Sequence, residues 1–234
     1  MASKSRLSFA SRITNAERLY KSLQNFETYN PTKNDLKLEN IQELILQLKS
    51  THSDFISAEQ AFINTADERK ALFGNSLGSI SKHVTYIIIY LRTICEKEDP
   101  IFKTINQQVK QMRETRSILI TINSKDDTIE RSEESYADRI QNFINVIDQI
   151  KLMGDKYNPE NQRINLDNLS VLKEQALKLN KEVSMFWNVY KPAEINRNKV
   201  FNLSKLIFDS VKEYVKETFT KNSREYRAVK NISF

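Results

Sequence analysis

Residues 38–73 have the sequence LENIQELILQLKSTHSDFISAEQAFINTADERKALF, and residues 166–201 have the sequence LDNLSVLKEQALKLNKEVSMFWNVYKPAEINRNKVF. In the first stretch apolar residues recur every seven positions, at Ile41, Leu48 and Phe55, and the second stretch keeps the same spacing. Such spacing buries one stripe of a helix against antiparallel neighbours. Each stretch therefore predicts one long helix, about 50 Å in length at 1.5 Å per residue.

The two stretches belong to a longer internal match. Tyr29-Asn30-Pro31 recurs as Tyr157-Asn158-Pro159, 128 residues later. Further matched pairs are Arg12 with Arg139, Leu44 with Leu172, Phe62 with Tyr190, Arg69 with Arg197, Phe73 with Phe201 and, after a four-residue deletion, Tyr90 with Tyr214 and Phe102 with Tyr226. The sequence therefore predicts an all-α fold made of two tandem copies of a roughly four-helix unit, each an antiparallel bundle with one long helix.

The match also sets the predicted domains. Repeat unit one covers residues 1–106, a connector covers 107–136, and repeat unit two covers 137–234. The expected helices are 9–28, 38–73, 76–95 and 100–113 in the first unit and 129–154, 166–201, 203–220 and 224–232 in the second. Pro192 predicts a kink or a break in the helix that contains it. Residues 114–128 contain a linker around Asn123–Asp127, and a helix that continues to Ile122 is the alternative for their first part.

The composition agrees with a helical, globular chain. Of 234 residues, 39% are apolar and 28% are charged, and only 3 Gly and 4 Pro are present, too few for the many turns of a β-rich fold. Cys95 is the only cysteine, so no intramolecular disulfide can form. Met1–Phe9 lacks the apolar run of a signal peptide, and Val84–Leu91 is too short to span a bilayer. These features predict a cytoplasmic protein without a transmembrane segment.

Residues for catalysis or metal binding were sought next. His52 and His83 are the only histidines, and neither has a second His or a Cys at ligand spacing. Three glycines cannot form a phosphate-binding loop. The carboxylates alternate with lysines, as on ordinary helix surfaces. The sequence therefore predicts no catalytic residue, no metal, no cofactor and no small-molecule ligand, and the protein is expected not to be an enzyme.

Arg69 and Arg197 occupy core-type positions near the ends of the two long helices. A buried arginine needs a carboxylate or several carbonyl partners. Two interpretations remain open: a site for an anion or a partner, and a structural arginine clasp that holds a helix end.

The two copies differ most in the third helix. Tyr86, Ile88 and Ile89 of the first copy align with polar or charged residues of the second. The aligned residues are Ser210, Lys212 and Glu213. A helix that is apolar on all sides is buried on all sides, so this helix is predicted to lie between the two repeat units. The alternative is an exposed patch, in which case Tyr86, Ile88 and Ile89 form the centre of an interface for a protein partner or for self-association.

Positive charge is concentrated at both ends of the chain. The net charge is +6 overall, with +4 in residues 1–21, +5 in residues 191–234 and −3 in the remainder. Such ends can attract nucleic acid or another polyanion. The candidate contacts are Arg6, Arg12, Arg18, Lys205, Lys212, Arg224, Arg227 and Lys230. A solvated basic surface is the simpler interpretation.

The start Ser5-Arg-Leu-Ser-Phe-Ala-Ser-Arg-Ile, the Tyr-Asn-Pro turn and the ending Asn222-Ser-Arg-Glu-Tyr-Arg-Ala-Val-Lys-Asn-Ile resemble a group of uncharacterised, duplicated all-helical proteins of Bacteroidota. This resemblance implies the fold and implies no activity, cofactor or site. The functional prediction is therefore a non-catalytic helical-bundle protein with a structural or interaction role. Polyanion binding is the alternative, and a membrane-active role for Val84–Cys95 is a minor third.

Overall fold

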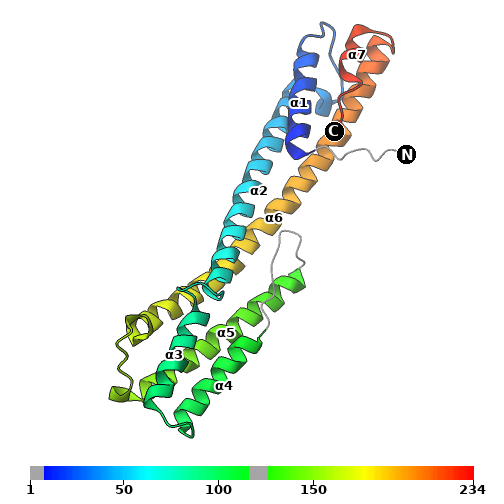
Figure 1. Ribbon diagram of the computed structural model, residues 1–234. Helices are drawn as coiled ribbons and strands as arrows, with labels where there is room; N and C mark the ends of the chain where they lie inside the picture. Colours follow the sequence, from blue (N-terminus) through cyan, green and yellow to red (C-terminus); the bar gives the residue numbers. More distant parts are fainter. Residues whose placement is uncertain (1–7, 116–125) are drawn as a thin grey trace, which may run out of the picture. The chain divides into compact units, whose positions relative to one another are not determined.

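The structure, a computed structural model, describes residues 8–115 and 126–234. Within these ranges the chain is helical and contains no strand. The α-helices are α1 (Phe9–Gln24), α2 (Leu38–Leu72), α3 (Ile80–Ile94), α4 (Pro100–Glu114), α5 (Asp126–Leu152), α6 (Leu166–Phe219) and α7 (Arg224–Val229) (Figure 1). Short 3-10 turns are η1 (Asn34–Leu36), η2 (Gly154–Lys156) and η3 (Gln162–Ile164). The predicted linker around Asn123 lies largely outside the described residues. Among the described residues, no helix is both long and apolar enough to cross a membrane.

Local sequence fixes where several helices begin. Asp99 caps α4 by accepting hydrogen bonds from the backbone N–H groups of Ile101 and Phe102, and Pro100 follows as the first helical residue. Asn165 caps α6 through the N–H of Asn168 at 2.8 Å. Ser223 caps α7 in the same way, by accepting a hydrogen bond from the backbone N–H of Tyr226 at 3.0 Å.

Helix α6 differs from the prediction. The expected helices 166–201 and 203–220 form one continuous helix, and Pro192 lies inside it without ending it. A proline lacks the N–H that would bond the carbonyl of residue 188. Both Asn188 and Pro192 are exposed, so water can satisfy that carbonyl. In the first copy, by contrast, Ser79 caps a new helix after Gly74–Gly78.

The chain folds into two compact units. The first unit comprises Met1–Ala58 and Val189–Phe234, and the second comprises Glu59–Asn188. These units differ from the predicted boundaries at 106 and 137, because each contains elements of both predicted repeat units. The first compact unit contains α1 and the start of α2, which belong to predicted repeat unit one. It also contains the end of α6 and α7, which belong to predicted repeat unit two.

Each compact unit has its own apolar core. In the first unit, buried residues of α1, η1 and α2, such as Leu19, Leu36 and Ile41, pack with Phe208 of α6 and Val229 of α7. In the second unit, α4 packs along α5, and their buried side chains join those of α3 and the start of α6. The core of each unit is therefore assembled from sequence segments far apart in the chain.

Two tyrosine contacts recur at the matched positions. Tyr29 donates a hydrogen bond to the carbonyl of Leu36 at 2.6 Å, and Tyr157 donates one to the carbonyl of Ile164 at 2.7 Å. Burial raises the pKa of both phenols. Each ring also meets a second tyrosine edge to face, Tyr214 at 5.5 Å and Tyr90 at 5.4 Å between centroids. Each contact thus fixes the turn that precedes a long helix.

Candidate functional site

In the second unit, Arg69 is enclosed near the end of α2, with only 1% of its surface exposed. Its guanidinium carbon lies 4.1 Å from the centroid of the Tyr136 ring on α5. It donates hydrogen bonds to Asn180 Oδ1 on α6 at 2.7 Å and to Ser132 Oγ on α5 at 3.1 Å. Burial lowers its pKa to about 10, an effect that the nearby Tyr136 and Glu133 partly offset. One side chain therefore ties three helices together.

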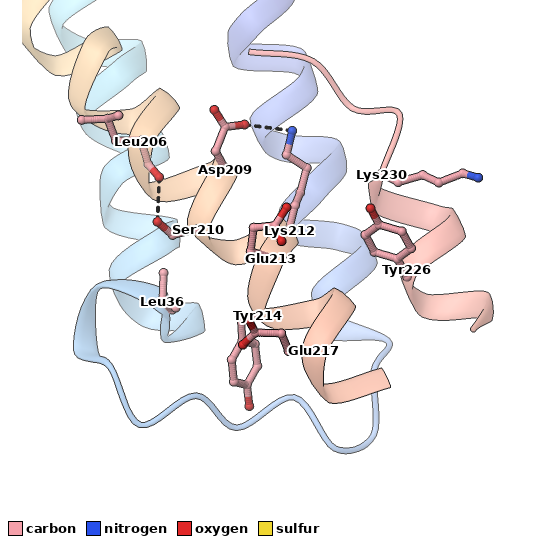
Figure 2. Close-up of a pocket in the computed structure, with 10 residues that line it drawn as sticks. All are labelled: Leu36, Leu206, Asp209, Ser210, Lys212, Glu213, Tyr214, Glu217, Tyr226 and Lys230. Atoms are coloured by element: carbon pink, nitrogen blue, oxygen red, sulfur yellow. Dashed lines mark hydrogen bonds and ion pairs between the residues drawn. The ribbon is translucent and has the colours of Figure 1, made fainter. Parts of the chain in front are cut away.

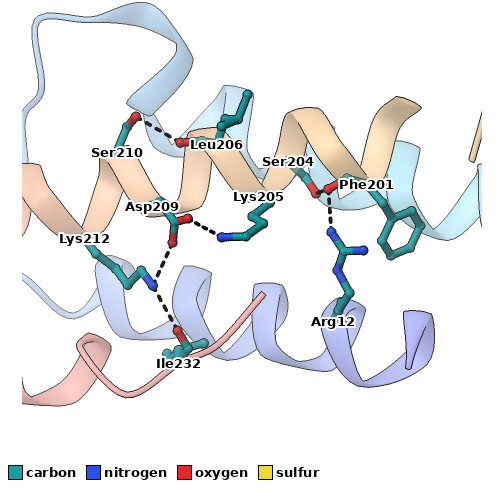
Figure 3. Close-up of polar contacts among 9 residues, drawn as sticks. All are labelled: Arg12, Phe201, Ser204, Lys205, Leu206, Asp209, Ser210, Lys212 and Ile232. Atoms are coloured by element: carbon teal, nitrogen blue, oxygen red, sulfur yellow. Dashed lines mark hydrogen bonds and ion pairs between the residues drawn. The ribbon is translucent and has the colours of Figure 1, made fainter. Parts of the chain in front are cut away.

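In the first unit, Arg197 is 8% exposed and stacks between two aromatic rings. Its guanidinium carbon lies 3.4 Å from the ring centroid of Phe55 and 4.0 Å from that of Phe9. Arg12 approaches the same Phe9 ring at 5.8 Å and donates a hydrogen bond to the carbonyl of Phe201 at 2.6 Å (Figure 3). Burial lowers the pKa of Arg12. Cation–π contacts of this kind are strongest when the cation is desolvated.

The second unit contains the same arrangement. Arg139 shares the Tyr136 ring with Arg69, at 5.5 Å from the centroid, and donates a hydrogen bond to the carbonyl of Phe73 at 3.2 Å. In both units two arginines therefore share one ring. The Arg69 and Arg197 guanidiniums face rings and polar groups of their own unit and are almost closed to solvent, so the geometry favours the structural clasp over an anion site.

The predicted interface on α3 is largely occupied by the core of the second unit. Ile88 is buried at 7% exposure, and Tyr86 is partly buried against the same core. Only Ile89, at 54% exposure, faces solvent. Because Ile88 is enclosed by neighbouring helices, the structure does not bring the three residues together as one accessible patch.

The predicted polyanion contacts fall into three groups. Arg6 lies outside the described residues. Arg12, Lys205 and Lys212 already have partners within the first unit: a carbonyl for Arg12, and the Asp209 carboxylate for both lysines. The remaining four are exposed in the first unit, namely Arg18, Arg224, Arg227 and Lys230, although Arg227 also donates hydrogen bonds to the carbonyl of Asn222 at 2.7 and 3.1 Å.

The helices that carry these four residues are neighbours. Helix α1 contacts α7, and Asn15 Nδ2 donates a hydrogen bond to the carbonyl of Ser233 at 2.8 Å (Figure 1). The two basic ends of the sequence therefore meet in one unit, which allows their charges to act together.

A hollow of about 650 Å³ lies between α6, α7 and Leu36 in the first unit (Figure 2). Asp209 on its wall forms ion pairs with Lys205 at 2.6 Å and with Lys212 at 2.9 Å. Burial raises the pKa of Asp209, but the hydrogen bonds from the two lysines outweigh burial and lower it overall. The lining is Leu36, Leu206, Asp209, Ser210, Lys212, Glu213, Tyr214, Glu217, Tyr226 and Lys230. This lining contains neither histidine nor cysteine, and the carboxylate of Asp209 is already paired with two lysines.

A smaller hollow of about 350 Å³ lies in the second unit beside Leu77, Arg163 and Val171. His83 borders it, but its Nδ1 lies 2.7 Å from the carbonyl of Ser79, a hydrogen-bonding distance. Throughout residues 8–115 and 126–234, no three His, Cys, Asp or Glu residues are grouped so that they could hold a metal ion.

The most prominent accessible apolar surface of the first unit runs along α6. Val189, Ile195, Leu203 and Leu206 are 58%, 60%, 50% and 67% exposed, and Pro192 between them is exposed as well. We call these five residues the α6 outer face. At 100° per residue they fall within about one third of the helix circumference. The opposite side of the same stretch carries the buried Arg197 and Phe201.

This surface was missed at the sequence level, although a signal for it exists. Val189 and Ile195 align with Ala61 and Asp67 of the first copy, where the repeat has no large apolar group. In the second unit the same α6 helix exposes Val171, Leu177 and Met185, whose aligned residues are Glu43, Lys49 and Ser57. A comparison of the two copies along the long helix would have found the whole set.

No family model, curated protein or solved structure matches the chain.

Proposed function

We propose that this protein is a non-catalytic helical interaction protein whose contact surface is the α6 outer face. One observation carries the proposal: Val189, Ile195, Leu203 and Leu206 are each at least half exposed although they are large and apolar. Single exposed apolar residues are common, but several large apolar residues exposed on one side of the same helix are typical of an interaction site.

The other long helix of the same unit provides an internal comparison. The exposed side of α2 in the first unit is mainly polar, with Glu39, Glu43, Lys49, Ser53 and Ser57. Its exposed large apolar residues are two, Leu46 at 59% and Ile56 at 47%, against the four of the α6 outer face. Both helices meet the same solvent and bury their opposite sides in the same unit. The apolar character of α6 therefore serves something other than the fold of the unit.

The proposal includes an origin by duplication of one helical unit. It is supported by pairs of contacts that recur at aligned residues: Tyr29 and Tyr157 to the carbonyls of Leu36 and Ile164, and Arg12 and Arg139 to the carbonyls of Phe201 and Phe73. Coincidence of sequence spacing alone would not reproduce the same donor and acceptor atoms.

Site-specific photo-cross-linking tests the contact surface. A photoreactive phenylalanine at Leu203, introduced into the protein in its native cells, is expected to give a covalent adduct of higher mass. The matched control places it at Ser53 on the exposed side of α2 in the same unit. A Leu206→Glu substitution should abolish the Leu203 adduct. If neither Leu203 nor Ile195 gives an adduct, this function is refuted.

Polyanion binding is the second candidate, because α1 contacts α7 and thereby brings Arg18 into the same unit as Arg224, Arg227 and Lys230. Fluorescence anisotropy of labelled DNA and RNA at about 50 and 200 mM salt tests it, since phosphate contacts weaken steeply with salt. Binding that is lost in an Arg224→Gln/Arg227→Gln double variant supports this candidate. No binding at the lower salt concentration removes it.

A further inference from the structure

We infer that the partner of the α6 outer face is a second copy of this chain, and that the two α6 helices pack antiparallel across a twofold axis near residues 197 and 198. This inference rests on the proposed function and adds the identity of the partner. Four observations lead to it: the continuity of the surface along one helix, the symmetry of its spacing, the position of its one charge, and its size.

The shape of the α6 outer face favours another helix as its partner. Residues 189–206 are part of one uninterrupted helix, so their side chains form a stripe about 26 Å long at 1.5 Å per residue. Pro192, Lys199 and Leu206 follow one another at seven-residue spacing, as do Val189, Asn196 and Leu203. Two interleaved heptad rows are the seam through which one helix packs against another.

Four of the five residues of the α6 outer face are placed symmetrically along the helix, whereas the fifth, Ile195, has the partly buried Val200 at its mirror position. About a midpoint between residues 197 and 198, Val189 is the mirror position of Leu206, and Pro192 is the mirror position of Leu203. A twofold interface requires a surface that is complementary to itself, with residue i against residue j and j against i. Antiparallel pairing about this midpoint meets that requirement, because each of these apolar residues faces an apolar residue of the other copy.

The centre of the stripe is polar. Lys199 is the charged residue in the heptad rows, and in this register it lies opposite Asn196 of the second copy. Its aliphatic stem can cover Ile195 while the ammonium group remains near the amide and the solvent. The two Lys199 side chains lie close to the twofold axis and repel each other. Association should therefore strengthen as salt screens that repulsion.

The size of the surface predicts a weak dimer. Four side chains that are each half exposed or more supply roughly 100 Å² apiece, so two copies would bury about 800–1,000 Å², which is below the range of stable specific interfaces and within that of weak, transient ones. The expected dissociation constant is micromolar, on the order of 10–100 μM.

Sedimentation equilibrium and cysteine cross-linking of the full chain test the inference together. Cys95 is the only cysteine, so a Cys95→Ser background allows single cysteines to be placed freely. Asn196→Cys lies close to the axis and should link to its counterpart through a short bismaleimide. Ser210→Cys lies outside the stripe, about 37 Å from its counterpart along the paired helices, and should not link.

Substitutions then separate self-pairing from other occupants. Leu206→Glu should weaken dimerisation at least tenfold, whereas Leu46→Glu on α2, where the wild-type side chain is 59% exposed in the same unit, should leave it unchanged. Lys199→Leu should strengthen self-association, because it removes the repulsion at the axis. Weaker association of Lys199→Leu would overturn the register, as would a cross-link from Ser210→Cys.

A protein that stays monomeric at roughly 1 mM overturns the self-pairing. If that monomer still gives a Leu203 photo-adduct with a different protein, the proposed function stands and only the partner is wrong. If it gives no adduct, both the partner and the proposed function are refuted.

Discussion

The hydrogen bond from Tyr157 to the carbonyl of Ile164 should be measurable as stability of the second unit. Tyr157→Phe removes the hydroxyl and keeps the ring, which is 7% exposed and edge to face with Tyr90. The loss combines the net hydrogen bond, about 0.5–1.5 kcal/mol, with part of the cost of a buried carbonyl left without its donor, about 1–3 kcal/mol. We expect about 1.5 kcal/mol of lost unfolding free energy, within the range for one buried polar contact.

Trp187 makes this loss observable. It is the only tryptophan, is 7% exposed and lies in the same unit as Tyr157, so its fluorescence follows the unfolding of that unit in urea. With a slope of about 2 kcal/mol per molar urea, the midpoint should fall by about 0.7 M.

The first unit supplies the matched experiment. Tyr29→Phe removes the corresponding hydrogen bond to Leu36 and should lower stability, by circular dichroism, as much as Tyr157→Phe does. Tyr20→Phe is the control, because the Tyr20 hydroxyl bonds the exposed Gln42 side chain and its loss should cost under about 0.5 kcal/mol. A Tyr157→Phe midpoint within 0.1 M of wild type would refute the assignment of stability to this contact, on the same slope of about 2 kcal/mol per molar.

Three further predictions concern single positions. Arg69→Ala should cost the second unit about 3–5 kcal/mol by Trp187 fluorescence, because it leaves a cavity beside Tyr136 and removes two hydrogen bonds; a loss under about 1 kcal/mol would contradict the clasp. The pKa of Asp209 is lowered in the folded protein, so its ion pairs stabilise the fold above the ordinary pKa of aspartate, and this stabilisation is lost as the pH falls through the folded pKa. Asp209→Asn should therefore lower the free energy of unfolding by about 0.5 kcal/mol at pH 7 and leave it unchanged in strong acid. An equal loss at both pH values would contradict this ion-pair assignment. Gly154→Ala should cost about 1 kcal/mol because its φ is +56°, whereas Gly78→Ala, with open space around it, should be neutral, and equal effects would contradict this reasoning.

The all-helical fold could be predicted because its signals are local. The heptad spacing placed α2 within one residue of its observed end, and the expected helix 100–113 agrees with α4 to within one residue. The merger of two expected helices into α6 was missed, since the prediction placed a break near residue 202, where Asn202 is a typical N-cap residue but lies inside the continuous helix. A proline within a helix ends it only when the lost hydrogen bond cannot be replaced by water.

The association of segments into compact units could not be derived from periodicity. Heptad spacing gives the buried side of a helix but not which helix covers it. The compact units therefore combine α1 with the end of α6, a pairing that the linear order of the repeats does not express. The same limit affected α3, where an apolar Ile88 indicated burial but not the helices that enclose it.

The continuity of α6 connects this fold to the proposed surface. In the first copy, Gly74–Gly78 interrupts the chain between the long helix and α3, so an apolar stripe across that point would be broken. The second copy lacks four residues there, and its long helix continues through Leu203 and Leu206 to Phe219. Under the proposed duplication, the deletion joins two helical faces into one face of a single helix. Only the second copy can therefore present the uninterrupted rows that an antiparallel helix pair requires.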